Sequence, residues 1–166
     1  MGAAVAVDDL DEEPPPGPPV LTVTSDNHKT VHSVPWDDLQ SEHGYKPLQV
    51  YNRTELMNIW FTQALATSLA NTAITANCAS PGFVRTRLAR DATGLFAVFI
   101  RLAAPFQSSP ETAGALATAP EMSQQTGGYY RKSRRAEPGR ADDPQAAARL
   151  WQISAELTET TDASSQ

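Results

Sequence analysis

The chain has 166 residues, of which 40% are hydrophobic, and a formal net charge of −6 at pH 7. Such a length suits one domain, and the acidic balance argues against general nucleic-acid binding. A single cysteine, Cys78, excludes an intrachain disulfide, and no apolar run is long enough to span a bilayer. We therefore expect a cytoplasmic protein with no transmembrane segment and no nucleic-acid partner.

The two ends of the chain are not expected to join the core. Residues 1–19 are acidic and then rich in proline, which is typical of an extended or disordered spacer. Residues 158–166 are polar and are expected to fray. The folded part is thus predicted to span residues 20–157.

The predicted elements begin with a short buried strand, Val20–Ser25. A polar loop with proline and glycine breakers follows, up to about Pro47. Residues 49–71 are rich in good helix formers, and their apolar residues recur at three- and four-residue steps, which predicts a long helix. Ile74–Ala79 reads as a second buried strand, in which Cys78 would be a buried structural thiol, and Pro81-Gly82 then turns the chain.

The remaining elements continue the alternation of helix and strand. Residues 94–106 predict a short apolar helix, and Ser109-Pro110 begins another. Gly127–Tyr130 predicts a short final strand or turn, and Asp143-Pro144 opens a C-terminal helix anchored by Leu150 and Trp151. This order favours an α/β fold with a parallel sheet of about three strands and flanking helices.

One pair of residues on the long helix bears on chemistry. Tyr51 and Glu55 are four apart, so they share a helix face with Cβ atoms roughly 5–6 Å apart. A carboxylate there should raise the phenol pKa above its ordinary value of about 10. Arg53 cannot compensate, because two residues along a helix is a rotation of about 200°. The plain alternative is that Glu55 is a surface helix residue.

These residues also carry a resemblance to a known family. The stretch that starts at Tyr51, YNRTELMNIWFTQALATSLANTAITANCASPGFVRTRL, resembles the active-site helix and following strand of short-chain dehydrogenases/reductases of the retinol-dehydrogenase-like branch. That family uses Tyr-x-x-x-Lys, and Glu55 stands at the position of the Lys. Val23-Thr24-Ser25, with His28 after it, is similar to the family's strand-end Val-Ser-Ser and following His. Further similar elements are Trp36–Glu42, Gly128–Tyr130 and Arg149–Trp151.

The resemblance implies roles for several residues. Tyr51 would be the general acid/base, and Ser25 would hydrogen-bond the carbonyl or alcohol oxygen. The cofactor would be NAD or NADP. The residues that would address the cofactor are Pro81, Gly82, Val84 and Thr86. Substrates would be lipophilic alcohols or aldehydes, and the helix at residues 49–71 would offer a homodimer face.

The resemblance covers only the C-terminal half of such an enzyme. The nine glycines form no Gly-x-Gly-x-x-Gly turn, the motif that holds the dinucleotide pyrophosphate. We therefore expect a partial Rossmann-like, doubly wound sheet over residues 20–157 that lacks the N-terminal half. The expected function is that of an oxidoreductase-like protein, truncated and inactive alone. Two alternatives stay open, a non-catalytic interaction module (a pseudoenzyme) and a gene-model fragment.

Other patterns predict no further chemistry. His28 and His32 are four apart, but they fall in an expected loop with no third ligand nearby, so we expect no metal site. Ser25 lacks the Gly-x-Ser-x-Gly elbow of a hydrolase nucleophile. The basic cluster of Arg131, Lys132, Arg134 and Arg135 is expected to be a solvated loop. The apolar run at 95–106 suits either a substrate lid or simple packing.

Overall fold

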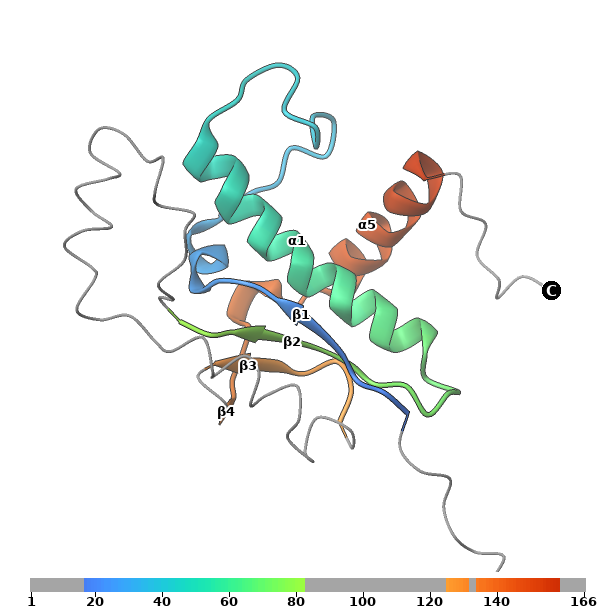
Figure 1. The fold of residues 1–166 in the computed structure, drawn as a ribbon. Helices are drawn as coiled ribbons and strands as arrows, with labels where there is room; N and C mark the ends of the chain where they lie inside the picture. Colours follow the sequence, from blue (N-terminus) through green and yellow to red (C-terminus); the bar gives the residue numbers. More distant parts are fainter. Residues whose placement is uncertain (1–16, 83–124, 132–133, 159–166) are drawn as a thin grey trace, which may run out of the picture.

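The structure is a computed structural model that describes residues 17–82, 125–131 and 134–158 (Figure 1). The helices expected at 94–106 and after Ser109 lie outside the described residues, as do Val84, Thr86 and the tail from residue 159. Most of the leader also lies outside them. The proposed division into leader, folded part and tail therefore stays a prediction.

A four-stranded, mostly parallel sheet forms the centre of the fold. The strands are β1 (Val20–Val23), β2 (Ala76–Ser80), β3 (Tyr129–Arg131) and β4 (Arg134–Arg135), and they lie in this order across the sheet. β1 is parallel to β2 and β2 is parallel to β3, with Val20 opposite Ala76 and Cys78 opposite Tyr129. The expected α/β class with a parallel sheet is confirmed.

The fourth strand corrects one expectation. About three strands were expected, which is close to the four observed, but the basic cluster was expected to be a solvated loop. Instead Arg131 lies in β3, and Arg134 and Arg135 form β4, which pairs antiparallel with β3. Both residues of β4 are exposed. Strands pair through backbone hydrogen bonds, which do not require hydrophobic side chains, so the sequence of β4 shows no hydrophobic pattern.

One helix packs on the sheet, and a second packs on that helix. The helix α1 spans Pro47–Ser68 and lies over β1 and β2, and α5 spans Pro144–Leu157 and packs beside α1 (Figure 1). Each starts with a proline in its first turn, where the missing N–H has no helical partner to lose. Asp143 caps α5 by accepting hydrogen bonds from the backbone N–H groups of Gln145 at 3.1 Å and Ala146 at 3.0 Å.

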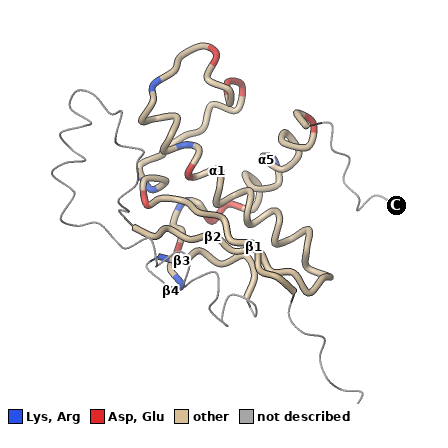
Figure 2. Tube along the Cα trace, viewed as in Figure 1, with Lys and Arg blue, Asp and Glu red and all other residues tan. Residues whose placement is uncertain are grey.

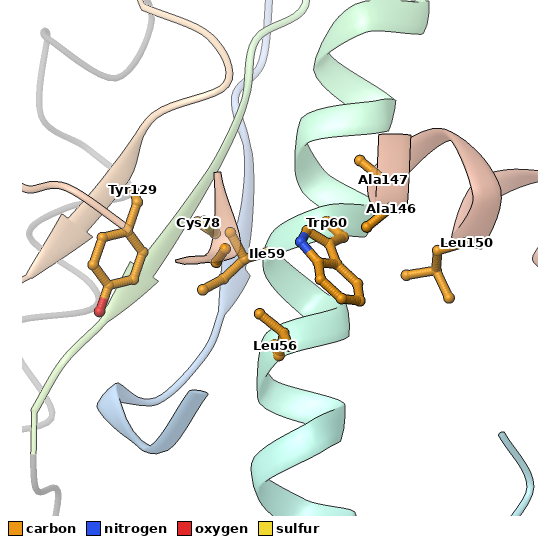
Figure 3. Packing of buried hydrophobic residues seen from close by; sticks show 9 residues of the cluster. Leu56, Ile59, Trp60, Cys78, Tyr129, Ala146, Ala147 and Leu150 are labelled. Atoms are coloured by element: carbon orange, nitrogen blue, oxygen red, sulfur yellow. The ribbon is translucent and has the colours of Figure 1, made fainter. Parts of the chain in front are cut away.

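The core lies between α1, the sheet and the first half of α5 (Figure 3). From α1 come Leu56, Ile59 and Trp60, of which Ile59 is 0% exposed. The other buried members of this cluster are Cys78, Tyr129, Ala141, Ala146, Ala147 and Leu150. Burial raises the pKa of the Cys78 thiol to about 12, so this cysteine is an unreactive part of the core, as its sequence position predicted.

An aromatic stack fixes the loop before α1. Trp36 lies parallel to Trp60, with ring centroids 5.7 Å apart and planes 12° apart. The guanidinium of Arg149 on α5 lies 4.5 Å from the ring centre of Trp36. The loop is thereby held to both helices by stacking and a cation–π contact.

Within the described part of the chain, neither helix is long and apolar enough to cross a membrane.

The central position of Ile59 gives a test of this packing. Replacing Ile59 with Ala should lower the free energy of unfolding by about 2–5 kcal/mol, because a buried cavity remains. Leu48→Ala, on the same helix at a side chain that is 51% exposed, should change it by less than about 0.5 kcal/mol. Urea denaturation followed by circular dichroism measures both. Equal losses in the two variants would contradict the packing of α1 on the sheet.

Candidate active site at the carboxyl ends of the strands

Ser25 lies at the end of the sheet where open α/β folds bind ligands. It follows β1, and the backbone N–H of Thr24 still bonds to the carbonyl of Ala79 at 2.9 Å. Its hydroxyl then caps the 3-10 helix η1 (Asp26–Thr30) by accepting from the N–H of Asn27 at 3.3 Å. Ligands of such sheets bind outside the carboxyl ends of the strands.

A side-chain hydrogen bond joins this strand end to α1. The hydroxyl of Thr24 donates to the backbone carbonyl of Glu55 at 2.8 Å. The link places the first half of α1 beside Ser25, and the Ser25 side chain lies close enough to the Tyr51 hydroxyl to lower its pKa. The structure therefore brings together Ser25, Tyr51 and Glu55, the three residues that the sequence pattern singled out.

The surroundings of Tyr51 keep its phenol protonated. Burial raises its pKa above the ordinary value of 10.0, and the nearby Glu55 carboxylate raises it further. The Ser25 side chain acts to lower the pKa but does not cancel these effects. Glu55 thus raises the pKa of Tyr51, as expected for a carboxylate four residues away on the same helix face.

Glu55 is more enclosed than an ordinary surface helix residue. Burial raises its pKa above 4.5, although the Thr24 and Tyr51 side chains, the Ser25 backbone and the charge of His28 all act to lower it. Its Oε2 atom is buried and has no hydrogen-bond partner among the described residues. A buried polar atom without a hydrogen bond lowers the stability of the fold, so Glu55 differs in its effect from a solvent-exposed glutamate.

Arg53 points to the other side of α1, as the helix rotation predicts. Its Nη2 atom donates to the carbonyl of Leu39 at 3.3 Å and to the hydroxyl of Ser41. Ser41 has a φ of 60°, a left-handed conformation that this contact helps to hold. Arg53 thus ties the loop to α1 and supplies no positive charge to Tyr51.

A second polar group, centred on Asp26, joins η1 to β3. The Tyr129 hydroxyl donates to Asp26 Oδ1 at 3.0 Å, Arg131 Nε donates to Oδ2 at 2.7 Å, and Lys29 Nζ lies 3.6 Å from Oδ1. Burial raises the pKa of Asp26, but the hydrogen bonds from Arg131 and Tyr129 outweigh it, so the pKa lies below 3.8. Charged positions gather around this end of the sheet (Figure 2).

His28 was expected in a loop, and this is wrong. It lies in η1 and is only 2% exposed, whereas His32 is exposed. Ring Nδ1 of His28 is 2.7 Å from the carbonyl oxygen of Ser25, and Nε2 is 3.2 Å from that of Pro138. The local signal for η1 was present, because Ser25 is a good cap and Asp26 suits a first turn. The contact with Pro138, which is 110 residues away, could not be predicted from the local sequence around His28.

The expected cofactor residues are only partly described. Pro81 and Gly82 follow β2 directly, at the same edge of the sheet as Ser25, and Gly82 has a φ of 83° that favours glycine. Val84 and Thr86 lie outside the described residues. No three His, Cys, Asp or Glu side chains of the described segments are grouped as a metal would require.

Comparison with known proteins identifies the family. No family model matches the chain. Retinol dehydrogenase 12 from Homo sapiens is 33% identical over 143 residues, which cover 83% of this chain and 45% of that protein. Retinol dehydrogenase 14 from Homo sapiens is 33% identical over 145 residues, covering 82% of this chain and 43% of that protein.

A solved structure shows the same fold. It is the crystal structure of an uncharacterized protein from Mycobacterium paratuberculosis, which aligns with a TM-score of 0.56 and 27% identity over 86% of this chain and 50% of that one. The chain spans slightly less than half the length of the curated relatives it matches. Over that shared part, the chain belongs to the short-chain dehydrogenase/reductase family, in its retinol-dehydrogenase-like branch.

Proposed function

We propose that this chain is an oxidoreductase-like protein of the alcohol–carbonyl type that does not turn over substrate by itself. The observation that carries this proposal is the Glu55 carboxylate beside the Tyr51 hydroxyl. The retained contact between Ser25 and Tyr51 supports binding of a substrate oxygen, and Glu55 opposes the proton transfer that would follow.

The Ser25–Tyr51 pair is suited to hold a carbonyl or alcohol oxygen. Both hydroxyls can donate to one oxygen atom, and the Ser25 side chain lies close enough to Tyr51 to affect its pKa. Oxidation of an alcohol would also require Tyr51 to accept a proton as phenolate. General acid–base catalysis works best when the pKa of the group lies near the working pH.

Glu55 acts against that requirement. A Tyr51 phenolate would form next to the Glu55 carboxylate. Repulsion between the two negative charges disfavours the phenolate and raises the pKa of Tyr51. The half-buried position of Tyr51 adds a desolvation cost in the same direction. Tyr51 therefore remains a neutral hydrogen-bond donor near neutral pH.

The family's cofactor, NAD or NADP, does not fit this site as the family uses it. In the family that the chain resembles, a Lys at this position would hold the cofactor ribose. Here Glu55 stands there, and its buried Oε2 atom has no hydrogen-bond partner among the described residues. The 166 residues also contain no Gly-x-Gly-x-x-Gly turn for the pyrophosphate. The residues that remain suited to the cofactor are those near Pro81-Gly82, at the carboxyl edge of the sheet.

The names of the relatives suggest the substrate class. Retinol dehydrogenases are named for a lipophilic alcohol, so the ligand of this chain would be a lipophilic alcohol or aldehyde. Its setting would be the cytoplasm, in keeping with the single buried thiol of Cys78. A second copy would bind along α1, where Leu48 and Phe61 are exposed.

A second candidate is a non-catalytic interaction module. Among the described residues β1 is one of the two edge strands of the sheet, and its Val20 and Val23 side chains are exposed. An uncharged edge strand can pair with another extended chain. Under this reading the Ser25–Tyr51 contact is a relic of the family's chemistry.

Activity measurements test the proposal. The folded chain, checked by circular dichroism, should oxidise neither NADH nor NADPH in the presence of retinaldehyde, and isothermal titration should show no saturable binding of either cofactor. Glu55→Lys should not restore turnover, because the pyrophosphate still lacks its glycine-rich turn. Robust turnover by Glu55→Lys that is lost on adding Tyr51→Phe would contradict the proposal.

The influence of Glu55 on Tyr51 has its own test. Glu55→Gln removes the carboxylate charge, so the pKa of Tyr51 should fall toward its ordinary value. The near-ultraviolet absorbance of tyrosinate, recorded as a difference between each protein and its Tyr51→Phe variant, measures this. Glu42→Gln, which removes an exposed carboxylate from the loop, is the matched control. An unchanged Tyr51 titration in Glu55→Gln would show that burial alone sets the pKa.

A further inference from the structure

The buried ring of His28 has two hydrogen-bond acceptors. Its Nδ1 atom lies 2.7 Å from the carbonyl oxygen of Ser25, and its Nε2 atom lies 3.2 Å from the carbonyl oxygen of Pro138. The side chain is 2% exposed and packs edge to face with the ring of Tyr129, with centroids 5.2 Å apart and planes at 75°. Water therefore has little access to either ring nitrogen.

A neutral imidazole cannot satisfy this arrangement. It carries one N–H, so one of its nitrogens would present a lone pair to a carbonyl oxygen. Two acceptors facing each other in a buried place repel, and neither gains a hydrogen bond. A ring with protons on both nitrogens would donate to Ser25 and Pro138 together. Burial disfavours that charged form unless a negative group lies nearby.

Glu55 is that negative group. The charge of His28 acts to lower the pKa of Glu55, so the two groups attract each other. The Oε2 atom of Glu55 has no hydrogen-bond donor among the described residues. We propose that His28 is a buried imidazolium that donates to both carbonyls and offsets the charge of Glu55. The family has a positively charged Lys at the position of Glu55. In this chain the positive charge would instead be on His28, in the neighbouring 3-10 helix η1.

The other charged groups around His28 do not replace Glu55 in this role. On its own helix, Asp26 is engaged by Tyr129 and Arg131, and Lys29 is near Asp26. From β3, Tyr129 presents an uncharged ring. In the segment around Pro138, Glu137 and Arg140 are both exposed to solvent.

The imidazolium would join two distant parts of the chain. One N–H holds the carbonyl of Ser25, which also accepts from the backbone N–H of His28 at 3.3 Å. The other holds Pro138, whose carbonyl also accepts from the N–H of Ala141 at 3.3 Å. Loss of one ring proton would weaken the hold on one of these segments, and with it the placement of Ser25.

The direct test is nuclear magnetic resonance of the full chain labelled at its histidine nitrogens, from about pH 5 to about pH 8. At neutral pH both ring nitrogens of His28 should carry protons. In Glu55→Gln the second proton should leave at a lower pH than in the wild-type chain. Glu156→Gln, which removes an exposed carboxylate near the end of α5, should leave the His28 signals unchanged.

The same spectra contain the outcomes that would overturn the proposal. One ring nitrogen without a proton in the folded wild-type chain at neutral pH would show a neutral imidazole. A His28 titration that is the same in Glu55→Gln and the wild-type chain would show that Glu55 does not hold the charge.

Discussion

The packing of α1 against the sheet determines where the polar groups of this protein can lie. Leu56 and Ile59 are buried with Cys78 of β2 and Tyr129 of β3, and Glu55, four residues before Ile59 on the same helix face, comes to the end of β1. The hydrogen bond from Thr24 to the Glu55 carbonyl then fixes the register between strand and helix. Without this burial, the contact between Ser25 and Tyr51 would have no rigid support.

The charges of the site follow from the same geometry. A helix that delivers Tyr51 to the strand end must deliver residue 55 with it, because the two share a face. A carboxylate at that position is therefore drawn into a half-buried place whether or not a partner is available. Among the described residues the buried Oε2 of Glu55 has no hydrogen-bond donor, whereas the His28 ring faces two carbonyl acceptors, so one group lacks a positive partner and the other favours a positive charge.

Much of the fold could be predicted from the sequence, because its long elements carry strong patterns. The helix expected at 49–71 was observed at Pro47–Ser68, and three strands were found close to their expected places. The strand β4 could not be predicted, since two exposed arginines show no alternation. The grouping of Ser25, Tyr51 and Glu55 could be inferred, because it depends on helix spacing and on the common edge of parallel strands.

The missed contacts share a physical cause. Asp26 bonds to residues of β3 more than 100 positions away, and His28 reaches Pro138, 110 positions away. Arg53 contacts a loop residue whose left-handed backbone is not encoded by glycine. Such contacts arise only when tertiary structure brings segments together, so local patterns do not reveal them.

The stack of Trp36 on Trp60 also gives the protein an optical property. Two nearly parallel indoles with centroids 5.7 Å apart are close enough for their electronic transitions to couple, and the Arg149 guanidinium lies against one of them. Their ultraviolet circular dichroism should contain a paired signal of opposite signs that isolated indoles lack. A rearrangement of the loop before α1 that separates Trp36 from Trp60 would therefore change the circular dichroism spectrum, and no added probe would be needed to detect it.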